Sequence, residues 1–222
     1  MFAAFLATLP IYAPNQLLFE TEILRQAAYM PSFANALLGA SALLGIAVAL
    51  MSARGRMDVV LRQGVVFMSA AAYVTGYGLF ALAASFEGFA QPAVAVAAGL
   101  LLAAATVALS IAWGTYLAQF DLRQALLWLA VMVGVAALVE LLLSSVTFAV
   151  GLIVFAVLVL LSCLVPCWLA WKGCLGEGEA RSAAGLGAAG QLRSMASVVA
   201  MPFVGLMVFA FIMGPVSSPS ST

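Results

Sequence analysis

The side chains that could carry chemistry are few, and Glu140 is the foremost of them. It lies in the apolar sequence VAALVELLLSS, and a carboxylate inside a membrane span costs about 2.5–3.5 kcal/mol at the bilayer centre and usually binds a ligand or a proton. Glu140 follows the expected start of its span, near Ala125, by roughly 22 Å of helix. This depth is close to the outer interface, so an interfacial structural glutamate and a cavity residue both remain open.

Two aromatic residues, Tyr77 and Trp113, are further candidates for the wall of a ligand cavity. Tyr77 belongs to the run VTGYG at residues 74–78, which is similar in composition to a potassium-channel filter. The order of residues differs and the run lies within a full span, which favours close helix packing through small residues. Trp113 lies near the expected cytoplasmic end of a span, where its ring either anchors in the headgroup zone or lines a pocket.

The usual equipment for catalysis and metal binding is missing from the sequence. There is no histidine, the commonest metal ligand and proton carrier. Cys163, Cys167 and Cys174 lack the paired spacing of a zinc site or a disulfide framework, and we interpret them as small hydrophobic residues. No set of nucleophile, base and oxyanion donors can be assembled, so we expect no catalytic residues, no metal, no cofactor and no enzymatic activity.

The elements that position these residues must lie in a lipid bilayer, which is the first expected partner. Of the 222 residues, 66% are hydrophobic and 7% are charged, whereas soluble domains contain about 45–50% apolar and about 25% charged residues. Eight basic and eight acidic residues give a net charge of zero. Because the chain has no basic field, we expect it to bind no nucleic acid by itself.

Apolar runs long enough to cross the hydrocarbon, about 20 residues for roughly 30 Å, define the expected spans. Residues 1–19 are a further candidate, but Pro10 and Pro14 predict a kinked or frayed helix. A cleaved signal peptide is the alternative, although no Lys or Arg precedes its apolar run. The sequence therefore predicts an all-α, polytopic transmembrane bundle of about seven spans. The six clear runs cover residues 33–52, 64–86, 92–118, 125–143, 146–171 and 194–213.

The basic residues predict the orientation of the bundle. Lys and Arg accumulate in cytoplasmic loops, and seven of the eight basic residues fall in alternate connections between the expected spans. The amino terminus is therefore expected in the cytoplasm. These residues are Arg54, Arg56, Arg62, Arg123, Lys172, Arg181 and Arg193.

The expected organisation has four parts. Residues 1–171 form a six-span membrane bundle, and residues 172–193, rich in Gly, Ala and charge, form a cytoplasmic joint. Residues 194–214 form the seventh span, and residues 215–222 a disordered Pro/Ser tail. The only other long connection expected is Glu20–Ser32. We also expect close helix approaches at small residues, among them Gly39, Gly45 and Gly134.

Three stretches can be compared with a known family: GLLLAAATVALSIAWGTYLAQFDLRQALLWL, LVLLSCLVPCWLA and MPFVGLMVFAFIMG. They resemble the membrane domain of certain bacterial LuxR-type helix-turn-helix regulators, a domain that is itself similar to major facilitator proteins. The resemblance implies a multi-pass protein of a bacterial cell membrane. It also implies a truncated domain, because the further helices and the DNA-binding domain of such a regulator are absent and would come from a partner chain.

Two function classes follow as expectations. In the first, the chain is a sensor-like membrane domain that binds an unknown small molecule or lipid between its helices and signals to that partner chain. In the second, it is a half-transporter of the major facilitator type, acting as a homodimer around a site at the membrane midplane. Coupled transport usually requires several intramembrane ionisable groups, and the chain offers at most Glu140. The sequence therefore favours the sensor-like class.

Overall fold

The structure, a computed structural model, describes residues 1–9, 23–54, 59–83, 85–86, 88–117, 120–146 and 148–172. The chain divides into two compact units, Met1–Gly176 and Glu177–Thr222, and all described residues belong to the first. Every regular element in the described part is an α-helix. The helices are α1 (Phe2–Ala7), α2 (Ile23–Ala53), α3 (Gln63–Ala83), α4 (Ala90–Leu117), α5 (Leu122–Ser144) and α6 (Phe148–Trp171).

Five segments of these helices are long and apolar enough to cross a membrane. They coincide with five of the predicted runs, so the described part is an all-helical bundle of the kind that is embedded in a bilayer. The predicted span 194–213, the joint before it and the tail after it lie outside the described residues. The five segments are Tyr29–Ser52, Gln63–Ala83, Ala90–Leu117, Arg123–Leu143 and Val150–Trp171.

The first helix is much shorter than the span expected over residues 1–19. In the described part it is a six-residue helix that ends at its carboxy-terminal cap, Thr8. Such a helix is about 9 Å long and cannot cross the hydrocarbon. Pro10 gives the physical reason, because it has no N–H to bond the carbonyl of Leu6 and disfavours helical backbone at Leu9. The described residues therefore contain five helices that could span a membrane, and the expected count of about seven is not confirmed.

Helix α2 begins ten residues earlier than the predicted span, at Ile23 rather than near residue 33. The expected connection Glu20–Ser32 was therefore too long. Hydropathy marks the part of a helix that fits in hydrocarbon, whereas polar residues such as Arg25 and Gln26 can continue the helix beyond it. Pro31 lies inside the helix, as is tolerated in membrane helices when neighbouring groups satisfy the freed carbonyl.

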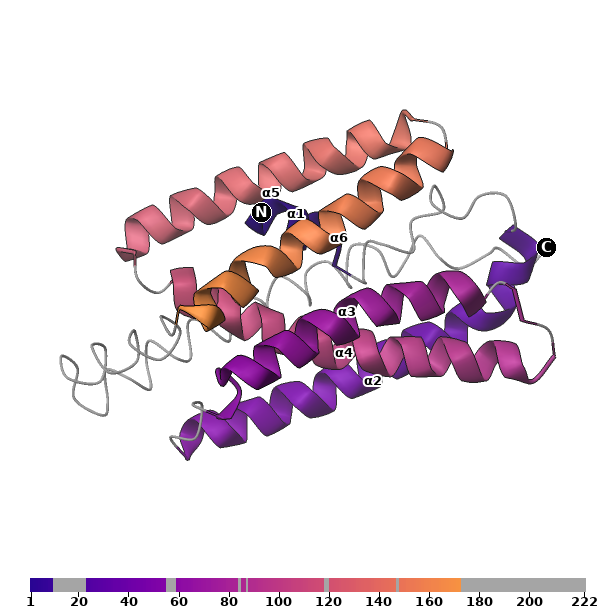
Figure 1. Cartoon of the computed structure of the whole chain (residues 1–222), viewed down its shortest axis with the longest axis horizontal. Coiled ribbons are helices and arrows are strands. Elements are labelled where there is room, and N and C mark those ends of the chain that lie inside the picture. The colour runs from indigo at the N-terminus through magenta and orange to yellow at the C-terminus, as the bar shows by residue number, and fades with distance from the viewer. Residues whose placement is uncertain are drawn as a thin grey trace, which may run out of the picture. The chain divides into compact units, whose positions relative to one another are not determined.

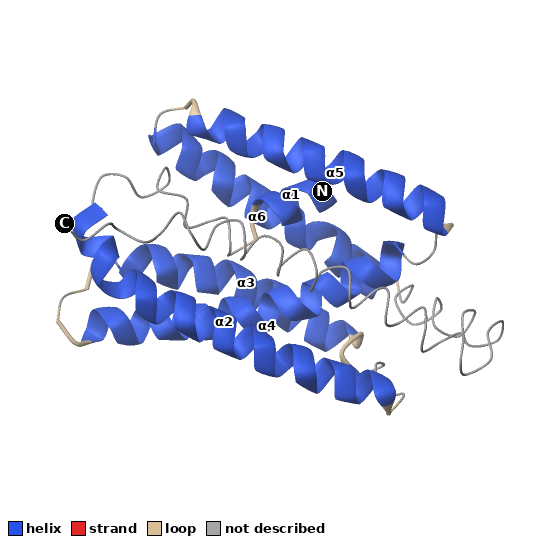
Figure 2. Ribbon diagram, turned by 180° about the vertical axis from the view of Figure 1, so that it is seen from behind, coloured by secondary structure: helices blue, strands red, loops and turns tan. Residues whose placement is uncertain are grey.

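The helices form two groups, α2 with α3 and α4, and α5 with α6, and α1 lies beside α5 and α6 (Figures 1 and 2). Helix α4 packs extensively against both α2 and α3, while α5 and α6 run beside each other. Helix α1 contacts α5 and α6, and α3 contacts α6. The buried face of α4 is rich in small residues that allow close approach, among them Ala95, Ala98, Gly99, Ala103 and Ala105.

Two glycines make the closest helix approaches. A Cβ at Gly76 would lie 2.7 Å from Cγ of Leu102, and one at Gly99 would lie 2.9 Å from the carbonyl oxygen of Phe33. The packing role predicted for the VTGYG run is thus confirmed at Gly76, where α3 meets α4. The same prediction was wrong for Gly39, Gly45 and Gly134, around which a Cβ would meet nothing within 4 Å in the described structure.

Candidate functional site: hydroxyl groups and aromatic rings at the end of α1

The candidate site is built around Thr8, the residue that ends α1. Thr8 is fully buried, and its side-chain hydroxyl donates back to the carbonyl of Ala4 at 2.8 Å. Its backbone N–H donates to the same carbonyl at 3.0 Å. The carbonyl of Thr8 itself has no residue of α1 left to bond, because the last carbonyls of a helix lack intrahelical partners. An acceptor is therefore left open inside the bundle.

Two tyrosines of α3 fill that requirement. The hydroxyl of Tyr73 donates to the carbonyl oxygen of Thr8 at 2.6 Å and lies 3.1 Å from Oγ1 of the same residue. The hydroxyl of Tyr77, one turn further along, donates to the same carbonyl oxygen. A carbonyl oxygen has two lone pairs, so the two phenols saturate it. We name this arrangement of Thr8, Tyr73 and Tyr77 the hydroxyl cluster.

The hydroxyl cluster lies deep within the membrane-spanning region. Tyr73 and Tyr77 are about 15 and about 21 Å along α3 from its first residue, in a helix roughly 31 Å long. Water is not available there to bond a free carbonyl or phenol, and each unsatisfied group would cost several kcal/mol. The mutual hydrogen bonds therefore hold the broken end of α1 in the interior of the bundle.

A continuous row of aromatic rings passes through the hydroxyl cluster. The ring of Tyr77 meets Tyr73 and Phe155 edge-on, each at 5.2 Å between centroids. Phe5 lies 6.2 Å from Tyr73 and 6.4 Å from Trp113. Contacts of this geometry contribute about 0.5–1.5 kcal/mol each beyond area burial. The row thus joins α6, α3, α1 and α4 through side chains.

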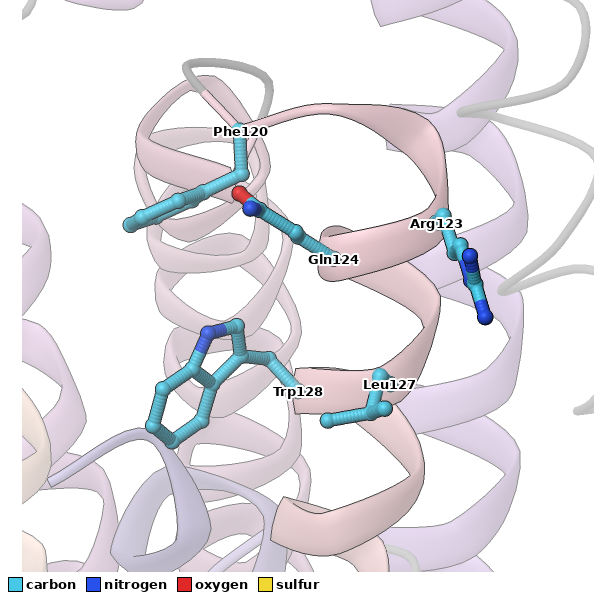
Figure 3. Close-up of a pocket in the computed structure, with 5 residues that line it drawn as sticks. All are labelled: Phe120, Arg123, Gln124, Leu127 and Trp128. Atoms are coloured by element: carbon cyan, nitrogen blue, oxygen red, sulfur yellow. The ribbon is translucent and has the colours of Figure 1, made fainter.

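The same row continues toward the connection between α4 and α5. Trp113 lies 6.2 Å from Tyr116, which lies 5.6 Å from Phe120. Phe120 borders a shallow hollow at this corner, together with Arg123, Gln124, Leu127 and Trp128. Figure 3 shows Phe120, Gln124 and Trp128 on one side of α5, with Arg123 directed away from them. Aromatic contact therefore extends from the hydroxyl cluster to the end of the bundle that is predicted to be cytoplasmic.

Trp113 does not lie where a headgroup anchor would. Only 3% of its surface is exposed, and its ring packs against Phe2 at 5.0 Å as well as Phe5. The headgroup interpretation is therefore wrong for this residue. Its Nε1 is buried without a hydrogen-bond partner among the described residues, which is rare for a buried donor. The exposed tryptophans are Trp128, Trp168 and Trp171.

The other sequence candidates have different outcomes. Tyr77 lies in the hydroxyl cluster, beside Trp113 in the same row of rings. Glu140 belongs to α5, but its side chain lies outside the described structure, so its role stays a prediction. Cys163 is buried in the core, as expected of a small hydrophobic residue, with Sγ 4.0 Å from the carbonyl of Ala70.

Sequence reasoning missed Thr8 and Tyr73. Both residues have hydrogen-bonding side chains within apolar runs of the sequence, and this feature could have identified them. Thr8 comes two residues before a proline, where a helix must end, and Tyr73 precedes Tyr77 by one helical turn in the middle of a span. Such groups need partners in hydrocarbon, and each is the natural partner of the other.

The comparisons with known proteins identify no relative. No protein-family model, no curated protein and no solved structure matches the chain. The site must therefore be interpreted from its own chemistry. It contains phenol and threonine hydroxyls that bond within the protein, aromatic faces, and an indole N–H without a partner among the described residues. These are groups that would suit an uncharged molecule.

Proposed function

We propose that the chain is a sensor-like membrane domain related to LuxR-type regulators, which binds a small molecule between its helices. A partner chain with further helices and a DNA-binding domain would receive the signal. The observation that carries the proposal is the hydroxyl cluster of Thr8, Tyr73 and Tyr77, a polar but uncharged site at mid-span. Its groups can recognise a ligand, and none is suited to carry charge across the bilayer. The proposed role is binding and not catalysis.

The aromatic row supports a route for the signal. It connects the hydroxyl cluster to Phe120, at the connection between α4 and α5. A change of position at Tyr73 would press on Phe5 and Trp113, because closely packed interiors transmit displacement. The α4–α5 connection is predicted to face the cytoplasm, where a partner with a DNA-binding domain would lie.

The proposal is tested on the full chain in liposomes. Classes of small uncharged molecules are screened for an increase in thermal stability, which a ligand produces by mass action. Each hit is repeated with Tyr77→Phe, and with Tyr116→Phe as the matched control, since no hydrogen bond joins Tyr116 to Thr8. A hit lost in Tyr77→Phe and retained in Tyr116→Phe supports the site. Stabilisation by no class, or equal loss in both variants, contradicts it.

A second candidate is a half-transporter of the major facilitator type that works as a homodimer. The observation in its favour is the exposure of α5, in which Ala136 is the only buried residue among the side chains that the structure describes. A second copy could cover this surface, with Glu140 on the same helix as the ionisable group. Substrate uptake into liposomes that is abolished by Glu140→Gln, together with dimers seen by single-molecule photobleaching, would favour this candidate. Monomeric protein without uptake would exclude it.

A further inference from the structure

We propose that the space occupied by α1 is a binding site for a neutral molecule carrying a carbonyl group and an aromatic ring, and that α1 closes this site until such a molecule displaces it. This inference rests on the proposed sensing function. It adds the chemical class of the ligand and names the segment that moves.

Helix α1 is held in place by its contacts and not by its own stability. It has six residues, too few to span the hydrocarbon and be held by the bilayer itself. No side chain caps its amino end. Its buried residues Ala3, Ala4, Phe5 and Ala7 are the source of its order. The helix therefore stays in place only while these packing contacts and the hydrogen bonds at Thr8 are kept.

The groups that α1 contributes show what could replace it. Its terminal carbonyl accepts hydrogen bonds from Tyr73 and Tyr77. If α1 leaves, the two phenols lose their acceptor, and a buried donor without a partner is costly. A replacing molecule must therefore bring a carbonyl oxygen or an equivalent acceptor. It must also bring a flat ring to replace those of α1. The ring centroids of Phe2 and Phe5 lie 5.0 and 6.4 Å from that of Trp113.

The site also indicates that the ligand is uncharged. The side chains that surround the end of α1 in the described structure, Phe5, Tyr73, Tyr77 and Trp113, carry no charge at neutral pH. A charged ligand would lack a counter-charge at a depth where the bilayer penalises it. The buried Nε1 of Trp113 is a donor that α1 leaves unused. A ligand with a second acceptor could bond this N–H, which would favour the ligand over α1.

Benzophenone is a suitable probe, because it is a neutral diaryl ketone that forms covalent adducts on illumination. Diphenylmethane has the same two rings and no oxygen. The full chain in liposomes is labelled with benzophenone, and the two molecules compete at matched mole fractions in the bilayer. We expect saturable labelling of peptides from α3 or α4. We also expect diphenylmethane to compete at least about 5-fold less well, since it leaves both phenols without an acceptor. Equal competition, or labelling only of lipid-facing surfaces, overturns the proposal.

A second measurement tests the displacement of α1. Ala4→Gly weakens α1 through helix propensity while removing only one methyl group, and should raise the apparent affinity for benzophenone by about 5-fold. Ala47→Gly, on the exposed surface of α2, is the control and should leave the affinity unchanged. An unchanged or lower affinity in a folded Ala4→Gly protein overturns the closing role of α1. A hit of a different chemical class that still depends on Tyr77 would leave the sensing function standing while this inference fails.

Discussion

The hydroxyl of Tyr73 lies 2.6 Å from the carbonyl oxygen of Thr8 and joins the middle of α3 to the end of α1. The two residues are 65 positions apart in the chain, so the bond fixes a tertiary contact and not a local turn. In hydrocarbon no water competes for either group. The position of α1 therefore depends in part on α3.

The first prediction concerns the shared carbonyl of Thr8. Tyr73→Phe or Tyr77→Phe alone leaves one phenol on this oxygen, and each should lower the free energy of unfolding by about 0.5–1.5 kcal/mol. The double variant leaves the carbonyl without a partner. It should lower the free energy of unfolding by more than the sum of the two single variants. Thermal unfolding in detergent micelles, arranged as a double-mutant cycle, measures the difference.

Tyr116→Phe is the matched control for this cycle. The ring of Tyr116 packs against Trp113 and Phe120, and the substitution keeps that ring while removing a hydroxyl that is not part of the hydroxyl cluster. It should change the free energy of unfolding by less than about 0.5 kcal/mol. Simple additivity of Tyr73→Phe and Tyr77→Phe would show that the two phenols do not share an acceptor.

The second prediction separates glycines that pack from glycines that do not. Gly99→Ala places a methyl group 2.9 Å from the backbone oxygen of Phe33, which cannot rotate away, and should destabilise the fold by about 1–3 kcal/mol. Gly76→Ala should destabilise the fold by a similar amount, because its methyl group would lie 2.7 Å from Cγ of Leu102, a fully buried side chain.

Gly134→Ala is the control on an open surface. A methyl group there meets nothing within 4 Å, and alanine is a better helix former than glycine by about 1 kcal/mol. This variant should be as stable as the parent or more stable. Thermal unfolding of the glycine variants under the same conditions checks the order. Destabilisation by Gly134→Ala equal to that of Gly99→Ala would mean that α5 is covered by another surface.

The third prediction uses the four tryptophans of the chain. Trp113 is 3% exposed and Trp171 is 74% exposed, so only the second should be reached by a quencher in the bilayer. Variants that retain one tryptophan, with the others replaced by Phe, are reconstituted in liposomes with brominated lipids. Quenching of Trp171 should be several times that of Trp113. Strong quenching of Trp113 would instead restore its interpretation as a headgroup anchor.

Span positions were predictable because they follow from the thickness of hydrocarbon and the rise of a helix. A kink or fraying at Pro10 was also predictable, since proline lacks the donor that a helix interior needs, but the end of the helix at Thr8 was not predicted. The burial of individual side chains was not predictable. For Trp113, near the end of α4, the depth in the membrane can be inferred from the sequence. The direction in which its ring faces around the helix is set by the neighbouring helices.

The hydroxyl cluster shows the same limit. Thr8 and Tyr77 are individually conspicuous as hydrogen-bonding residues in apolar runs, yet nothing in the sequence says that α1 stops at the level of Tyr77. Gly99 and Gly134 are likewise both small residues within spans, and only packing distinguishes them. In membrane helices that are apolar on all sides, the hydrophobic pattern does not mark the face that meets a partner.

The last prediction tests the orientation of the bundle in the membrane. The basic residues predict this orientation, and it decides on which side of the membrane the aromatic row ends. In a background lacking the three native cysteines, Ser85→Cys and Asp121→Cys place single thiols at exposed positions in the α3–α4 and α4–α5 connections. A maleimide that cannot cross the membrane should label Ser85→Cys in intact cells. It should label Asp121→Cys only after permeabilisation, because the connection with Arg123 is expected in the cytoplasm.

Ser145→Cys, between α5 and α6, is exposed and should behave like Ser85→Cys. The opposite pattern would place Phe120 outside, and the aromatic row could not then carry a signal to a cytoplasmic DNA-binding partner.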